Sequence, residues 1–223
     1  VGPPPGAPLF MMLGRLFSAF VPLEHAALSI NVMSALASSF TILFLFWTIT
    51  AFGRKLAKVK GEFDNGKIIA VLASGFVGAA AYTFSDSFWF SAVEGEVYAM
   101  SSLFTAVVFW AILKWEALED RKHETRWLVF IAYMMGLSIG VHLLNLLTIP
   151  AIGLVYYFKK YNSTLKGTVI TLAVSVAILG VIQSLIIPGV VTMAGGFELF
   201  FTNTLGMGFN IGTFYFTMLT IAF

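Results

Sequence analysis

Apolar stretches far longer than those of soluble helices alternate with short polar segments along this chain. A stretch of about 20 apolar residues is enough to cross the hydrocarbon core of a membrane as a helix. The pattern therefore predicts an all-α transmembrane bundle of about six to seven membrane helices plus one interfacial helix. The expected membrane helices are 26–52, 68–84, 97–113, 127–141, 143–158, 168–188 and 211–223, the last being the beginning of a further span. Residues 189–210 are expected to form a long loop or re-entrant segment.

Residues 127–158 admit two interpretations. As one helix, these 32 residues would measure about 48 Å, well over the hydrocarbon thickness of about 30 Å. As a hairpin, they form two short spans that meet near residues 140–142. Basic residues lie at both ends, with Arg126 before the stretch and Lys159 and Lys160 after it. Because Lys and Arg collect in cytoplasmic loops, this pattern favours the hairpin.

Residues 1–25 are expected to form an extracytoplasmic loop that contains the interfacial helix. Four of the first eight residues are prolines, three of them consecutive, and we expect no helix there. The stretch 9–20 is apolar but too short to span a membrane. With Arg15 near its middle, it fits a helix that lies in the membrane surface.

Composition supports a multi-pass membrane protein. The chain is 59% hydrophobic and 11% charged, whereas a soluble domain carries about 25% charged residues. We expect one transmembrane domain over 1–223 and no nucleic-acid partner, because the net charge is only +2 and nearly all Lys and Arg residues lie in a few short loops. The absence of cysteine excludes disulfides and thiolate metal sites. The chain begins at Val1 and ends at Phe223 inside an apolar run, so we expect a fragment that is incomplete at both ends.

The distribution of basic residues predicts which face each loop occupies. Twelve of the thirteen Lys and Arg residues fall in the loops 53–67, 114–126 and 159–166, and Arg15 is the remaining one. With the hairpin, all three loops lie on one face, which the positive-inside rule makes cytoplasmic. The other polar features then collect on the extracytoplasmic face, and we interpret that face as the site. These features are residues 1–25, residues 85–96, the apex at His142 and residues 189–210.

An acidic and aromatic segment, 85–102, lies between two expected spans and holds Glu94, Glu96 and Tyr98. Ionised carboxylates at membrane depth are costly unless they face water, a partner or a substrate. In an extended loop, the alternation of these residues would point all three side chains one way, whereas in a helix Glu96 would point away. We assign Glu94 and Glu96 to catalysis and Tyr98 to substrate binding. The alternative is a pair of solvated acids that stabilise a helix start.

Four further residues are candidate ligands or positions beside a ligand. His142 and Asn145 lie three residues apart at the expected apex and could bind a phosphate or a polar substrate, the alternative being a structural His. Trp89 is a candidate sugar contact, although its aromatic neighbours fit an interfacial belt better. Arg15 is a candidate partner of a lipid phosphate, its alternative being a side chain that snorkels. The residues assign no metal site and leave the need for a divalent metal open.

Three stretches resemble a known family of membrane proteins. They are PPGAPLFMMLGRLFS, FWFSAVEGEVYAMSSLFTAVVFWAILKWE and RWLVFIAYMMGLSIGVHLLNLLTIPAIGLVYYFKK. Over residues 3–161 the chain resembles the membrane proteins catalogued as domain of unknown function 2723. That family is similar to the protein O-mannosyltransferases and to other glycosyltransferases of the GT-C superfamily.

The resemblance implies an inverting glycosyltransferase that moves a sugar, mannose or a similar hexose, from a polyprenyl-phosphate carrier to a protein hydroxyl on the extracytoplasmic face. It places the principal base in the first extracytoplasmic loop, upstream of Val1, so we expect this fragment alone to be inactive. The family's His-Pro-Pro-Gly corresponds to Pro3-Pro4-Pro5-Gly6. Pro5 and Gly6 are therefore candidate substrate contacts, with Pro3 in the place of the His.

A secondary transporter or lipid-linked-sugar flippase is the alternative, with Glu94, Glu96 and His142 as a relay. Many transporters show an internal repeat and place ionisable groups near the membrane midplane. This sequence shows no repeat, and its acids lie beside the end of a span. The expected partners are membrane lipid, the lipid-linked sugar donor and a protein acceptor, and the oligomeric state stays open.

Overall fold

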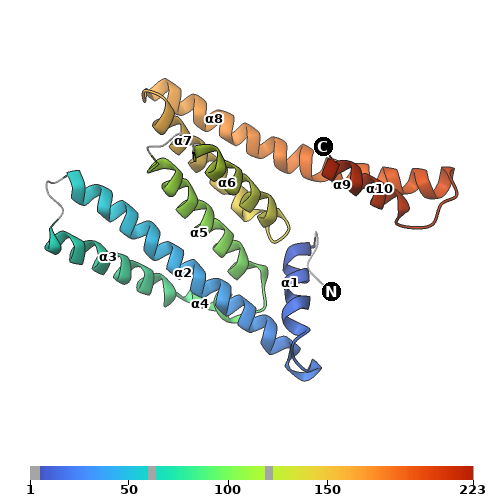
Figure 1. Ribbon diagram of the computed structural model, residues 1–223, viewed down its shortest axis with the longest axis horizontal. Coiled ribbons are helices and arrows are strands. Elements are labelled where there is room, and N and C mark those ends of the chain that lie inside the picture. Colours follow the sequence, from blue (N-terminus) through green and yellow to red (C-terminus); the bar gives the residue numbers. More distant parts are fainter. Residues whose placement is uncertain (1–5, 60–63, 119–122, 223) are drawn as a thin grey trace. The chain divides into compact units, whose positions relative to one another are not determined.

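The computed structural model describes residues 6–59, 64–118 and 123–222, and all regular structure in these ranges is helical. The chain divides into two compact units, Val1–Ser163 and Thr164–Phe223, which are described separately (Figure 1). The expected all-α class is confirmed. Whether the two units make the single domain expected from the sequence stays a prediction.

The first unit contains five α-helices at the positions of the expected spans, the helix α1 before them, a short helix α4 between two of them, and two 3₁₀ turns. Their bounds are α1 Pro8–Ser18, η1 Leu23–His25, α2 Ala26–Val59, α3 Asn65–Thr83, α4 Asp86–Val93, α5 Val97–Glu116, α6 Glu124–Ile139, η2 Leu143–Thr148 and α7 Ile149–Lys160.

Helices α2 and α3 run side by side, and α5 lies along α2 (Figure 1). Two glycines of α3 make the first contact close. A Cβ at Gly75 would lie 2.5 Å from Thr50 Cγ2, and a Cβ at Gly78 would lie 2.8 Å from Ile49 Cδ1. Small residues allow helix backbones to approach in this way within a membrane.

Helix α5 is the most buried element of the first unit. Val108 and Ala111 are fully buried, and Trp115 at its end stacks on Tyr156 of α7, with 5.6 Å between ring centroids. A second cluster around Phe104 and Val97 packs against α1. The core of the unit is therefore arranged around α5.

The stretch 127–158 forms a hairpin, so that prediction is confirmed. Glu124, at the start of α6, accepts from Lys160 Nζ at 2.5 Å and lies 3.3 Å from Lys159 Nζ, both at the end of α7. A single straight helix would separate these ends by about 50 Å. Pro150 lies in the first turn of α7, where the missing N–H would have no helical partner, and it does not kink the helix.

The described parts of the three basic loops meet at one end of the first unit. Lys55 of α2 pairs with Glu116 at the end of α5. Lys159 Nζ donates to the carbonyls of Trp115 and Leu118, at 2.5 and 3.0 Å, and so caps the end of α5. These contacts bring together the helix ends that flank all three loops.

The second unit is a long helical segment followed by a short returning helix. Its elements are α8 Leu165–Val181, the π-helical turn η3 Ile182–Ile186, α9 Ile187–Leu199, the π-helical turn η4 Phe200–Thr204 and α10 Ile211–Ala222.

Of the two alternatives for 189–210, the loop is wrong for most of its length, because the helical segment continues to Thr204. Pro188 lies in the first turn of α9, directly after η3. A proline within a helix has no N–H to donate, and its ring crowds the carbonyl four residues earlier. The wider π-turn before Pro188 accommodates the proline, so the helix continues past it. Glu198 is an internal anchor: its carboxylate accepts from Asn210 N at 2.6 Å and Thr213 N at 2.9 Å, and thus caps α10.

Within the described residues, four helical segments are long and apolar enough to cross a membrane. They are Leu23–Lys58, Asn65–Thr83, Val97–Glu116 and Leu165–Thr204. The hairpin helices α6 and α7 are shorter, with 16 and 12 residues. The chain is a helical, multi-pass membrane protein.

Candidate active site

The predicted site residues of the first unit gather at the end away from the basic loops. The turn at 140–142 lies here, between α6 and η2. Leu9 N–H at the start of α1 donates to Gly140 O at 2.8 Å. Tyr98, in the first turn of α5, lies beside His142, with 5.4 Å between ring centroids. Since α5 has 20 residues, about 30 Å of helix separates this end from the basic loops.

The acidic and aromatic segment is more helical than the sequence predicts. Its residues 86–93 form α4, and α5 begins at Val97, so Glu94 to Glu96 are the connection. Glu96 N–H donates to Glu94 O at 2.8 Å, which is the i to i+2 bond of a γ-turn at Gly95. Glu94 and Glu96 have extended backbone dihedrals, but the turn at Gly95 and the start of α5 at Val97 exclude the single straight loop that was one of the two alternatives.

Both carboxylates of this turn are exposed and have no hydrogen-bond or ion-pair partner among residues that the structure describes. Glu96 occupies the N-cap position of α5 but makes no side-chain capping bond. A Cβ at Gly95 would lie 3.0 Å from Ile30 Cγ2 and 3.1 Å from Asn31 Oδ1, so the turn packs closely on α2. The two acids are thus held in place by backbone packing while their carboxylates face outward.

His142 is fixed by its own backbone. Its Nδ1 accepts from Leu144 N–H at 3.1 Å and caps η2. In a neutral imidazole the other ring nitrogen then carries the proton, so Nε2–H is the available donor of this half-buried ring. Tyr98, 51% exposed, offers a hydroxyl on the same end of the unit.

Asn145 lies in the core rather than at the surface with His142. Its Nδ2 donates to Ser138 Oγ at 2.9 Å, and its backbone carbonyl accepts from Thr148 Oγ1 at 2.7 Å. The i, i+3 rule fails here because His142 precedes η2 in extended conformation and does not share its helical turn. Asn145 ties the two arms of the hairpin together, and its contact with substrate stays a prediction.

The remaining predicted residues lie on separate elements. Arg15 is exposed on α1 and has no ion-pair partner within the described ranges. Gly6 is exposed with φ of +92°, a left-handed conformation that favours glycine. Trp89 is half exposed on α4 and stacks on Phe84, with 6.2 Å between centroids. Pro5 lies outside the described residues, as does Pro3.

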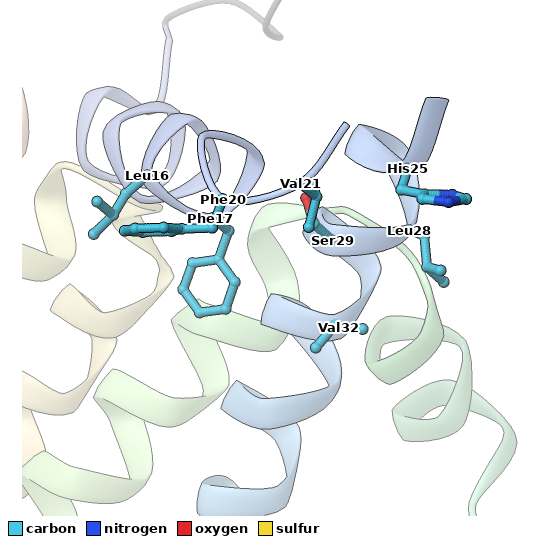
Figure 2. Close-up of a pocket in the computed structure, with 8 residues that line it drawn as sticks. All are labelled: Leu16, Phe17, Phe20, Val21, His25, Leu28, Ser29 and Val32. Carbon is cyan, nitrogen blue, oxygen red and sulfur yellow. The ribbon is translucent and has the colours of Figure 1, made fainter. Parts of the chain in front are cut away.

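Sequence reasoning missed two features of this end of the unit. One is Gly140, where a Cβ would lie 3.0 Å from Leu9 Cβ, so that its missing side chain admits α1. The other is an apolar groove of about 520 Å³ between the end of α1 and the start of α2, with Phe17 and Phe20 on one side and Leu28 and Val32 on the other (Figure 2). Its sequence signal is the run of large apolar residues on both sides of the break at Pro22.

Comparison with known proteins points to one family. Residues 1–165 match the family model described as "Protein O-mannosyl-transferase TMEM260 N-terminal domain". A Dictyostelium discoideum protein named "Protein O-mannosyl-transferase tmem260" is 26% identical over 165 residues, which are 71% of this chain and 18% of that protein. The Mus musculus "Protein O-mannosyl-transferase TMEM260" is 26% identical over 139 residues, which are 62% of this chain and 18% of that protein.

The chain thus spans about a fifth of the length of these curated relatives. No solved structure matches it. The family match covers the whole first unit, including the hairpin apex, the acidic turn and α1. The chain belongs to the family of the protein O-mannosyl-transferase TMEM260 N-terminal domain.

Proposed function

We propose that the full-length protein is an inverting membrane glycosyltransferase. It moves mannose or a similar hexose from a polyprenyl-phosphate carrier to a protein hydroxyl on the extracytoplasmic face. The observation that carries this proposal is the juxtaposition, at one end of the first unit, of the acidic turn, the Tyr98–His142 pair and α1. The names of the relatives, which are protein O-mannosyl-transferases, support it.

The chemistry requires three kinds of group. The bond between the sugar C1 and the phosphate oxygen breaks, a bond from C1 to the acceptor oxygen forms, and the hydroxyl proton passes to a carboxylate. A lipid phosphate as leaving group removes the need for a nucleotide site, but it needs a cation or donors to stabilise its developing charge. An acceptor needs a base, and a sugar needs hydrogen-bonding partners.

The residues of this chain supply some of the groups that the phosphate, the acceptor and the sugar need. Arg15 contributes charge and His142 contributes its Nε2–H to the phosphate, and Tyr98 contacts the sugar. Glu94 and Glu96 assist the base or orient the sugar hydroxyls. The family resemblance places the principal base in the chain upstream of Val1, and it makes Pro5 and Gly6 further candidate substrate contacts.

We also propose the sidedness that this chemistry needs. The basic loops 53–67, 114–126 and 159–166 are cytoplasmic, and the acidic turn and the hairpin apex are extracytoplasmic. This assignment is supported by the ion pairs Lys55–Glu116 and Lys159–Glu124, which join the flanks of the basic loops at one end of the unit. The candidate site residues lie at the other end.

Sugar transfer by the full-length protein in membranes tests the proposal. The assay follows label from polyprenyl-phosphate mannose into protein, for the wild type and for Glu94→Gln and Glu96→Gln. We expect transfer by the wild type and its loss in both variants at unchanged expression. Asp86→Asn is the matched control, since Asp86 is an exposed acid of the same segment outside the turn, and it should keep activity. Full activity in both Gln variants would remove these residues from the mechanism.

A further inference from the structure

The groove between α1 and α2 is almost entirely apolar. Phe17 and Phe20 face Leu28 and Val32 across it, and His25 lies at its edge (Figure 2). Ser29 is the other polar residue of the lining, and its hydroxyl already donates to Ala26 O at 2.7 Å. The volume of the groove, about 520 Å³, lies within the range of roughly 300–1,000 Å³ typical of ligand pockets. A polar ligand would lose its hydration there without new hydrogen bonds, so the occupant is apolar.

Helix α1 connects this groove to the candidate site. Its first residues bond to the hairpin apex through Leu9 N and Gly140 O, 2.8 Å apart, and its last turn carries Leu16 and Phe17 into the groove. Arg15 lies between these two ends, about 9 Å of helix rise from Leu9. Its guanidinium is exposed, and no carboxylate pairs with it among described residues.

The polar apex, the unpaired Arg15 and the apolar groove therefore lie in this order beside the 11-residue helix α1. This order matches an amphiphile whose sugar, phosphate and hydrocarbon chain follow one another in the same way. The cation favours a lipid with net negative charge, which a polyprenyl phosphate carries, whereas in phosphatidylcholine the choline cation balances the charge of the phosphate.

We infer that the groove binds the first isoprene units of the polyprenyl chain of the sugar donor, with the phosphate beside Arg15. This inference rests on the proposed function for the identity of the lipid. It adds a binding site for the chain that is separate from the acidic turn.

Photolabelling of the full-length protein tests the assignment without any need for sugar transfer. The probe is a polyprenyl phosphate with a diazirine on its second isoprene unit, and the labelled peptide is mapped by mass spectrometry. We expect label within residues 16–32, and we expect excess unlabelled polyprenyl phosphate to compete it. Label confined to other segments would overturn the assignment.

A pair of substitutions sharpens the test. Val32→Trp fills the groove, while Leu36→Trp adds the same ring one helical turn further along α2, outside the lining. Both positions are 45% exposed, so the two variants carry a similar folding risk. Val32→Trp should reduce labelling about tenfold, because displacing one isoprene unit removes several buried methylene groups. Leu36→Trp should label like the wild type, and equal labelling of the two variants would contradict the inference.

The competing lipid distinguishes the occupants. Equal competition by phosphatidylcholine would show that the groove takes bulk lipid, and would overturn the inference. Selective labelling of a protein that transfers no sugar would support polyprenyl binding in the groove and contradict the proposed transferase activity. Sugar transfer by a protein that is never labelled in the groove would support the transferase activity and contradict binding in the groove.

Discussion

At the residue scale, His142 uses its two ring nitrogens for different purposes. Nδ1 accepts the Leu144 N–H and caps η2, whereas Nε2 is the donor available to a ligand. The structural His that the sequence offered as an alternative and the ligand-binding His are therefore compatible in one side chain. A substitution that keeps the cap and removes the ring separates the two roles.

His142→Asn is that substitution, because Asn is a good N-cap residue. We expect the full-length Asn variant to unfold at the wild-type temperature but to lose sugar transfer. His142→Ala should lose the cap as well and destabilise the protein by about 1 kcal/mol. Thermal unfolding in detergent and the transfer assay measure the two effects. An Asn variant with wild-type transfer would leave His142 with a structural role alone.

Gly140 decides whether α1 reaches the apex. A Cβ there would lie 3.0 Å from Leu9 Cβ and 3.3 Å from Leu137 O, so Gly140→Ala should cost about 1–3 kcal/mol of stability through overpacking. Gly136→Ala is the matched control on the same helix, since a Cβ at Gly136 meets nothing within 4 Å. It should stabilise the helix by about 0.5–1 kcal/mol. Equal unfolding temperatures for the two variants would contradict the close contact of α1 with the apex.

At the scale of elements, the hairpin α6–η2–α7 is closed at both ends. Ser138 and Asn145 join its arms near the apex, and Glu124 joins them at the open end through Lys159 and Lys160. The hydrogen bond from Lys160, followed by that from Lys159, lowers the pKa of Glu124 below its usual 4.5. The ion pairs thus stabilise the folded state when Glu124 is ionised.

The linkage has a definite direction. Because the folded pKa is depressed, the contribution of Glu124 is present above pH 4.5 and is lost as the pH falls through the lowered folded value. Glu124→Gln should therefore lower the unfolding temperature at neutral pH and approach the wild type in acid. Unfolding temperatures between pH 3 and 7, with Asp86→Asn as control, measure this. A difference from the wild type that stays constant with pH would contradict the role of the charge.

At the scale of the molecule, the sequence predicted the helical class, the hairpin and the four long apolar helices found among the described residues, because hydrophobic length and basic flanks determine them. It failed at residues 189–210, where Pro188, Gly195 and Gly196 indicate a break but a π-turn lets the helix continue. It also did not indicate the γ-turn at Gly95, which interrupts the extended backbone of Glu94 and Glu96. Local backbone geometry of this kind leaves no periodic signal.

The candidate site, like the fold, was predicted in part from the sequence. The gathering of Tyr98, His142 and α1 at one end followed from topology, which the sequence supplied. The burial of Asn145 depends on the conformation of a single residue, His142, before η2, and the groove beside Phe20 depends on how α1 turns into α2. Contacts between elements of this kind are tertiary and have no counterpart in residue spacing.

The sidedness of the first unit is the central claim, and cysteine accessibility measures it most directly. These 223 residues contain no cysteine, so once any cysteine elsewhere in the full-length protein is replaced by serine, each single replacement reports without background. Leu144→Cys lies at the apex and Lys58→Cys beside a basic loop, and both positions are exposed. In sealed vesicles of known orientation, we expect a membrane-impermeant maleimide to label position 144 from the extracytoplasmic side and position 58 from the cytoplasmic side alone. Labelling of both positions from the same side would contradict the one-ended extracytoplasmic site.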